Sequence, residues 1–219
     1  MVYYVHSRPI WSGWGIDIEV NDEHYQGKVL EIVKNFSYLG MTFSTTGSLT
    51  KAQQVLASQG NKALFELKRY CNKFENIKPS LMCELFDRLI EPILSYGSEV
   101  WGFHEAPHVE RLHMKFCKWT LCVKTSTPNA IVRCELGRTD LQTKRYVKII
   151  KYWMKILECD NARYIKTVYD VLVSDVENNK INWASNVKNL LYSVGMGDAW
   201  FFQTVGDYNI FIFTNIDSI

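Results

Sequence analysis

The side chains of this 219-residue chain that could carry chemistry are its acids, its histidines and cysteines, and a row of lysines. Metal-dependent phosphoryl transfer needs carboxylates that share divalent ions, and no two Asp residues are adjacent anywhere in the chain. The acids Glu19, Asp22 and Glu23 lie in a polar stretch, where solvated charges are the simpler interpretation. The carboxylates therefore predict neither a catalytic residue nor a metal site.

Two pairs of possible zinc ligands stand four residues apart, which is a spacing that zinc sites on helices use. His104 and His108 form the first pair, but Pro107 lies between them and argues against a regular helix there. His113 and Cys117 form the second, on the apolar side of "ERLHMKFCKW", and no second ligand pair follows at zinc-site spacing. A packed histidine and cysteine is the favoured interpretation, with metal binding as the alternative.

No other catalytic pattern can be assigned. A Ser, His and acid triad can be assembled from any chain of this size, so none is assigned here. The string "GSLTKAQQ" lacks the GK[ST] ending of a phosphate-binding loop. We therefore expect no cofactor in this chain.

The cysteines and the hydropathy indicate the cellular environment of the chain. The six cysteines include no CxxC pair and lie in apolar-periodic segments, which favours reduced, buried thiols. No apolar run approaches the ~18 residues of a membrane span, and no signal-type apolar core follows the first residues. We expect an intracellular protein without a membrane partner. Nucleus and cytoplasm stay open, as does the oligomeric state.

Basic residues concentrate in one part of the chain, although the net charge is only +2. Residues 108–155 hold 11 Lys and Arg against 3 Asp and Glu, which is a net +8. The segments before and after carry −2 and −4. This distribution predicts one basic face.

The centre of that face is the segment "DLQTKRYVKIIKYWMKILECD", which predicts a helix. Its apolar residues recur at helical spacing, as do its lysines on another face. The apolar stripe is Val147, Ile150, Met154 and Leu157, and the lysine row is Lys144, Lys148, Lys151 and Lys155. Together with Arg or Lys at 111, 115, 118, 124, 133 and 138, the row can neutralise a phosphate backbone without reading sequence. A solvated helix face is the alternative.

The rest of the chain predicts a mainly α fold with short β-strands at the N-terminus. The runs "MVYYV", "WGIDIEV", "KVLEIV" and "FSYLGMTF" read as strands or hairpins. From Ser48, a plausible cap, the period becomes helical. Pro92 should divide "PSLMCELFDRLIEPILSYGSEVWGF", and Gly137 should end "NAIVRCELG". Further helices are expected near 164–174 and 183–194, before a strand-like or irregular tail.

Several strings, taken in order, resemble the region downstream of the catalytic centre in reverse transcriptases of non-LTR, LINE-type retrotransposons. They are "MVYY", "NFSYLGMTFSTTGS", "KALFELKRY", "LFDRLIEPILSYGSEVWGF", "VERLHMKFCKWTLCVKTSTPNAIVRCELGR", "KIIKYWMKIL" and "NWASNVKNLLYSVGMGDAWFFQTVGD". The most specific part is "ILSYGSEVWG" followed by "TPNAIVRCELGR". The likeness runs from Met1 to about Asp207.

The resemblance implies a role for each part of the chain. Tyr38, Leu39 and Gly40 correspond to the primer grip, where the last palm strands present the primer end. Residues 1–47 would be a palm-edge hairpin remnant, 48–158 a thumb-like helical bundle, and 159–219 further helices with an irregular tail. Gly40 would let the backbone approach a nucleic-acid strand while Tyr38 packs beside it.

The family's metal-binding aspartates would lie upstream of "MVYY", so we expect no polymerase activity from this chain alone. In the intact RNA-directed DNA polymerase, which uses Mg, the palm and fingers would come from a longer chain. The expected partner is an RNA template and DNA primer duplex, gripped during target-primed synthesis. The alternatives are a helical protein-interaction module and a non-functional relic of a retrotransposon.

Overall fold

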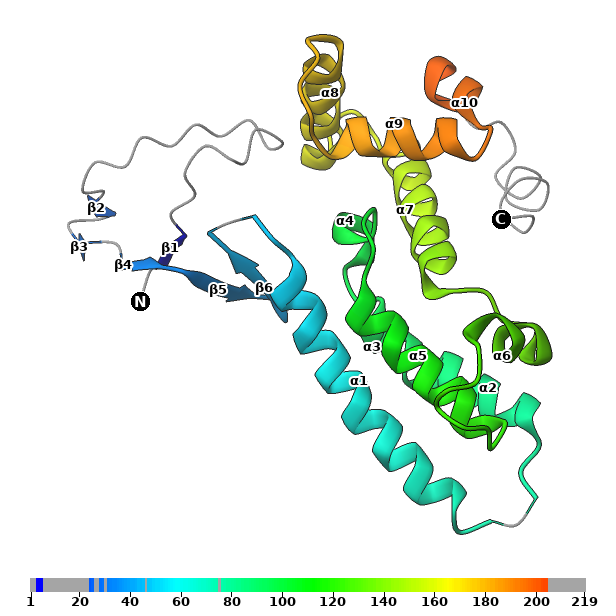
Figure 1. The fold of residues 1–219 in the computed structure, drawn as a ribbon. Coiled ribbons are helices and arrows are strands. Elements are labelled where there is room, and N and C mark those ends of the chain that lie inside the picture. The colour runs from blue at the N-terminus through cyan, green and yellow to red at the C-terminus, as the bar shows by residue number, and fades with distance from the viewer. Residues whose placement is uncertain are drawn as a thin grey trace.

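The structure is a computed structural model, and it describes residues 3–5, 24–25, 28–29, 31–45, 47–74 and 76–204. Within these ranges the chain is mainly α-helical, with a short antiparallel hairpin before the helices (Figure 1). The expected fold class is confirmed. The strand expected at "WGIDIEV" and the tail after residue 204 lie outside the described residues.

The described strands are short and pair two by two. They are β1 (Tyr3–Val5), β2 (His24–Tyr25), β3 (Lys28–Val29), β4 (Glu31–Val33), β5 (Asn35–Tyr38) and β6 (Met41–Ser44). β1 pairs in parallel with β4, and β2 pairs antiparallel with β3. β5 and β6 form the hairpin that leads into the helices, with Tyr38 opposite Met41 at its closed end.

The hairpin closes through a two-residue turn made of Leu39 and Gly40. Their φ angles are 45° and 81°, and two positive φ angles in succession are typical of a type I′ turn, whose twist matches that of a hairpin. Glycine adopts a positive φ readily, whereas a leucine there is strained by about 1–3 kcal/mol. Leu39 is nevertheless exposed, so burial of its side chain does not offset the strain.

Ten helices follow within the described residues. They are α1 (Thr50–Cys71), α2 (Pro79–Leu89), α3 (Glu91–Leu94), α4 (Ser98–Trp101), α5 (Pro107–Thr120), α6 (Asn129–Leu136), α7 (Leu141–Leu157), α8 (Tyr164–Glu177), α9 (Trp183–Ser193) and α10 (Gly197–Phe202). The predicted break near Pro92 is confirmed, since α2 ends before it and α3 begins beside it. The predicted stop at Gly137 is also confirmed, with a left-handed φ of 60°.

The start of the first helix differs slightly from the expectation. α1 begins at Thr50 with Leu49 at the N-cap position. Ser48 lies one residue earlier, and its Oγ accepts a hydrogen bond of 3.3 Å from the backbone N–H of Thr50. The Ser48 hydroxyl therefore caps the first helical N–H, although Ser48 lies one residue before the N-cap position.

α10 was not predicted, because six residues with two adjacent phenylalanines give a weak helical pattern.

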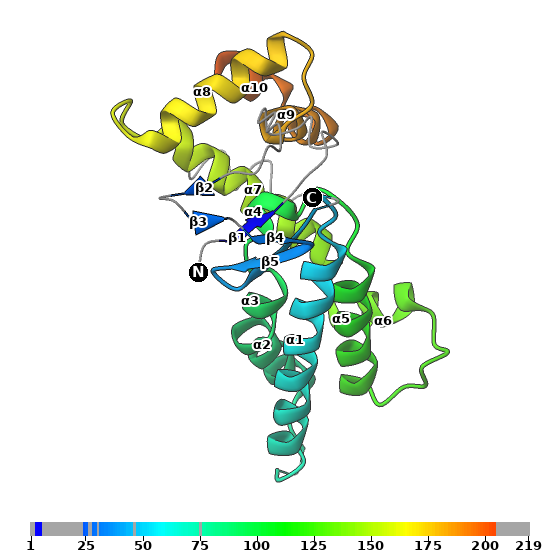
Figure 2. The same ribbon diagram turned by 90° about the vertical axis from the view of Figure 1, so that its left-hand side faces the viewer.

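A first core lies between α1, α2, α3 and α5, which run side by side below the hairpin (Figures 1 and 2). Phe86 and Phe116 stack at its centre with ring centroids 4.3 Å apart. Gly60 lets α1 approach its neighbours, because a Cβ there would overlap the side chain of Leu94 and lie 2.9 Å from Leu112. Helices with so close a contact form a rigid base for the hairpin.

A second core lies between α7, α8, α9 and α10, above the first in Figure 1. Trp153 is fully buried in it, and its Nε1 donates a hydrogen bond of 2.8 Å to the hydroxyl of Tyr169. The second core begins at Ile149, within α7, while Leu141 at the start of α7 belongs to the first. α7 therefore joins the two cores.

The predicted apolar stripe of α7 does face the interior. Ile150 and Met154 are fully buried, and Val147 and Leu157 are partly buried against the second core. The buried surface is wider than the stripe, because Ile149, Trp153 and Ile156 are buried as well. Less of the helix surface is left for the lysine row than the sequence pattern implied.

Candidate nucleic-acid interface

The turn of the β5–β6 hairpin lies against the short connection between α3 and α4. The hydroxyl of Tyr96 donates a hydrogen bond of 2.7 Å to the carbonyl oxygen of Leu39. A Cβ on Gly97 would lie 3.4 Å from the sulfur of Met41, and one on Gly40 would lie 3.6 Å from the ring of Tyr96. These contacts hold the strained turn in place against the helical bundle.

A cavity of about 500 Å³ opens between the turn and the helices. Its lining comes from the hairpin, the α3–α4 region and α7. The lining residues are Tyr38, Leu39, Met41, Phe43, Pro92, Ser95, Tyr96, Gly97, Glu99 and Lys148. The structure thus brings together Tyr38 and Leu39, two of the three residues that the resemblance assigns to a primer grip, and Lys148 of the lysine row.

The cavity combines aromatic and apolar walls with two charged groups. Tyr38 and Tyr96 are about half exposed, at 58% and 49%, so their rings are accessible to a ligand. Lys148 and Glu99 provide one cation and one carboxylate. A pocket of this size with apolar walls and a few polar groups is typical of small-molecule sites, and exposed tyrosines can stack on nucleobases.

The lysine row itself is divided. Lys144 lies 2.8 Å from Asp87 Oδ1, and Lys148 lies 3.1 Å from Glu91 Oε1 and donates a short hydrogen bond to Ser95 Oγ. Lys151 is partly buried and Lys155 is exposed. Within the described ranges, neither of the last two makes an ion pair. The four lysines share a helix face, but the first two hold α7 against α2 and α3.

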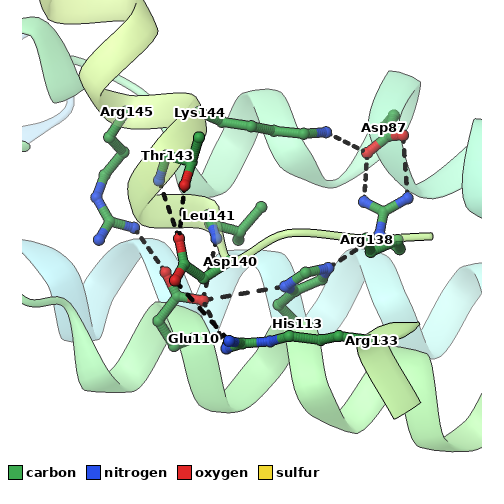
Figure 3. Close-up of polar contacts among 10 residues, drawn as sticks. All are labelled: Asp87, Glu110, His113, Arg133, Arg138, Asp140, Leu141, Thr143, Lys144 and Arg145. Atoms are coloured by element: carbon green, nitrogen blue, oxygen red, sulfur yellow. Dashed lines mark hydrogen bonds and ion pairs between the residues drawn. The ribbon is translucent and has the colours of Figure 1, made fainter. Parts of the chain in front are cut away.

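Asp87 anchors a polar network beside this row (Figure 3). Both of its oxygens accept hydrogen bonds from Arg138, at 2.6 and 3.1 Å, and Arg138 Nε donates to His113 Nε2 at 3.0 Å. Burial raises the pKa of the Asp87 carboxyl, but the hydrogen bonds from Arg138 and Lys144 outweigh it, and the pKa lies below its usual value. Asp87 is therefore ionised at neutral pH.

Glu110 of α5 anchors the other half of the network. Its Oε1 accepts from Arg145 at 3.1 Å, and its Oε2 accepts from the backbone N–H of Leu141 at 3.1 Å. Burial raises the pKa of Glu110, but His113, the Leu141 N–H and Arg145 together lower it below its usual value. The carboxylate holds the N-terminus of α7, where a helix dipole favours a negative charge.

His113 and Cys117 are both fully buried in α5. Burial lowers the pKa of His113 and raises the pKa of Cys117 to about 11, so the imidazole is neutral and the thiol protonated. Because His113 Nε2 accepts from Arg138, that nitrogen is not free for a metal. Within the part of the chain that the structure describes, no group of three or more His, Cys, Asp or Glu side chains is arranged to hold a metal ion.

His104 and His108, the other pair of possible metal ligands, lie near the start of α5. The helix begins at Pro107, so His108 is helical and His104 precedes the helix. His108 Nε2 lies 3.4 Å from Gln54 Nε2 of α1. Among the described helices, none is both long and apolar enough to cross a membrane.

The groups that position this site carry no recognisable signal in the sequence. Tyr96, Glu91 and Asp87 lie within the strings that carried the resemblance, and Tyr96 lies in the most specific of them, but none of the three was expected to have a role of its own. Asp87 is 57 residues from Lys144, and Tyr96 is 57 residues from Leu39. Only the folded chain brings them together, so no local spacing could have identified them.

The fold and the site define a mainly helical protein in which a strained hairpin turn and a helical bundle line an open, aromatic cavity with one lysine and one glutamate. Comparison of the chain with protein-family models, with curated proteins and with solved structures finds no match. The function is therefore argued from the geometry and from the sequence resemblance.

Proposed function

We propose that this chain grips the end of a primer-template duplex, as the primer-grip hairpin and thumb-like portion of a LINE-type reverse transcriptase. The observation that carries the proposal is the cavity in which Tyr38, Leu39 and Lys148 meet. The ordered strings that resemble this enzyme class support it independently. The catalytic carboxylates and their Mg ions would belong to another part of the intact enzyme, so this chain alone would bind without polymerising.

Three of the lining residues, Tyr38, Leu39 and Lys148, have a physical use in such a grip. The exposed ring of Tyr38 offers a stacking surface, and base stacking on an aromatic side chain contributes about 1–3 kcal/mol. The strained turn places Leu39 in the lining of the cavity, and strain of this kind concentrates at functional sites. The Lys148 ammonium adds a positive charge for a backbone phosphate near the primer end, although Glu91 partly neutralises it.

The test compares two RNA–DNA hybrids of equal length, one with a recessed DNA 3′ end and one blunt. Fluorescence anisotropy at low salt should show that the wild-type chain prefers the recessed end. Tyr38→Ala should reduce this preference about 5- to 150-fold, which corresponds to the loss of one stacked base. Tyr164→Ala on α8 is the matched control, because Tyr164 is 84% exposed and lies away from the cavity lining.

Two results would overturn the proposal. One is an equal affinity of the wild-type chain for recessed and blunt hybrids. The other is an equal loss of preference in the Tyr38 and Tyr164 variants. Absence of any hybrid binding at low salt would favour a protein-interaction module or a relic instead.

A further inference from the structure

The cations of the basic segment 108–155 fall into two groups in the structure. Five make ion pairs with Asp87, Glu91, Glu110 or Asp140: Arg133, Arg138, Lys144, Arg145 and Lys148. The other six make no ion pair with any described residue: Arg111, Lys115, Lys118, Lys124, Lys151 and Lys155. Only the second group has its full charge available to a ligand.

Three of the available cations lie on one face of α5. Arg111, Lys115 and Lys118 recur at intervals of four and three, which places them in one stripe of the helix. Glu110, the acidic residue of this helix, points instead toward α7, where it bonds Arg145 and the Leu141 N–H. α5 therefore separates its charges, with the carboxylate inward and the cations outward.

This stripe lies beside α1. Lys115 Nζ donates a hydrogen bond of 2.9 Å to Asn61 Oδ1 of α1. Lys68, two turns further along α1, places its Nζ 4.9 Å from the ring centroid of Trp119. Burial lowers the pKa of Lys68, and repulsion by Lys115 lowers it further. We call Lys68, Arg111, Lys115 and Lys118 the α1–α5 basic strip.

The surroundings of the strip contain aromatic surface and no acid paired with it. Within the described ranges, no carboxylate makes an ion pair with any of its four members. Glu66, the acid nearest to Lys68 on α1, pairs with Arg69 instead, at 2.6 Å. Phe65 lies on α1 one turn before Lys68 and Arg69 and is 65% exposed. Cations beside an exposed aromatic ring match the chemistry of nucleic acids.

We propose that the α1–α5 basic strip binds the sugar-phosphate backbone of a nucleic-acid duplex. The first and last of the three α5 cations are seven residues apart, or about 10 Å along the helix axis at 1.5 Å per residue. Phosphates of one strand follow each other about every 3.4 Å along the duplex axis, so about three phosphates fit this length. The strip is separate from the cavity, and the choice of nucleic acid as partner rests on the proposed function.

The test uses two triple variants with the same net charge. The first is Arg111→Gln, Lys115→Gln and Lys118→Gln in the strip. The second, the control, is Lys124→Gln, Lys151→Gln and Lys155→Gln, which removes three available cations elsewhere. The probe is a blunt RNA–DNA hybrid of about 20 base pairs, long enough to cover the site of a small domain. Its affinity is measured over a salt series, and far-UV circular dichroism verifies folding.

The strip variant should lower the slope of log affinity against log salt by about 3, whereas the control should lower it by less than 1. At 0.1 M salt this corresponds to about 500-fold weaker binding, if each phosphate contact contributes a slope of about 0.9. Because Lys118 also donates to the Thr125 carbonyl, the single variant Arg111→Gln is measured as well. It should lower the slope by about 1 without affecting the fold.

Equal losses in the two triple variants would overturn the proposal, since only the net charge would then matter. Equal competition by polyglutamate and by the hybrid would also overturn it and assign the strip to an acidic protein. The strip variant should weaken recessed and blunt hybrids by the same factor. A wild-type chain that shows steep salt dependence without preferring the recessed end would refute the cavity as a primer grip and leave the strip intact.

Discussion

Replacing Lys148 by methionine tests whether the lysine row of α7 belongs to the fold as well as to a binding surface. The ammonium of Lys148 lies 3.1 Å from Glu91 Oε1 and also bonds Ser95 Oγ. The Glu91 side chain is only 13% exposed. Methionine keeps most of the apolar stem of the lysine, so the main loss is the partner of a largely buried carboxylate.

The expected cost follows from that lost partner. Leaving the Glu91 carboxylate without its ion-pair partner costs about 1–3 kcal/mol. For a chain of this length, each kcal/mol lowers the melting temperature by about 2–4 °C, so Lys148→Met should melt about 2–12 °C lower than the wild type. Lys155→Met is the control, because Lys155 is exposed and makes no ion pair with a described residue. It should change the free energy of unfolding by less than about 0.5 kcal/mol.

The assay is urea unfolding followed by far-UV circular dichroism, with the free energy of unfolding extrapolated to water. A second substitution isolates the cause. Glu91→Gln in the Lys148→Met background should recover part of the lost stability, because it removes the unpaired charge. If Lys148→Met and Lys155→Met have the same small effect, or if Glu91→Gln recovers nothing, the reasoning from the buried carboxylate is refuted.

Two further predictions concern the first core and the polar network around Asp87 and Glu110. Gly60→Ala should destabilise the protein by about 1–3 kcal/mol, because the added Cβ overlaps neighbouring side chains. This cost exceeds the gain in helix propensity of about 1 kcal/mol. Ser58 is exposed on the same helix, so Ser58→Ala should be near neutral in the same urea assay. Acidification should also destabilise the protein. Burial depresses the pKa of His113, and the pKa values of Asp87 and Glu110 lie below their usual values because their partners outweigh burial. The unfolded chain therefore binds more protons than the folded one, and stability present at pH 7 is lost as the pH falls below ~6.5 and then through the carboxyl range. A urea midpoint that stays constant between pH 7 and pH 3 would contradict this.

Local rules predicted most of the secondary structure. Pro92 divides two helices because it lacks an N–H and clashes with the preceding turn, and Gly137 ends α6 because it adopts a left-handed φ at little cost. The hairpin was expected from its β-rich residues around a glycine. The positive φ of Leu39, 45°, could not be predicted from the residue pattern. The rest of the fold holds this leucine in a conformation that leucine rarely adopts.

The candidate site was predictable only in parts. Tyr38 and Leu39 were found through the resemblance, and Lys148 was found through the spacing of lysines. Nothing in the sequence indicated that the three line one cavity, because their proximity depends on the packing of the hairpin against the helices. Tyr96 establishes that packing through a single hydrogen bond to the Leu39 carbonyl, and its partner is a backbone atom that carries no sequence signal.

The net charge of residues 108–155 also depends on partners from elsewhere in the chain. The excess of +8 over residues 108–155 counts only acids within the same window, whereas Asp87 and Glu91 come from an earlier part of the chain and neutralise Arg138, Lys144 and Lys148. A helical period identifies which residues share a face, but ion pairs across elements decide how much charge that face presents. Because the acids of α2 and α3 pair with cations in the first two turns of α7, three of the six cations of the segment that make no ion pair with a described residue lie on the outer face of α5. The surface to test first for nucleic-acid binding is therefore the α1–α5 basic strip rather than the more regular lysine row.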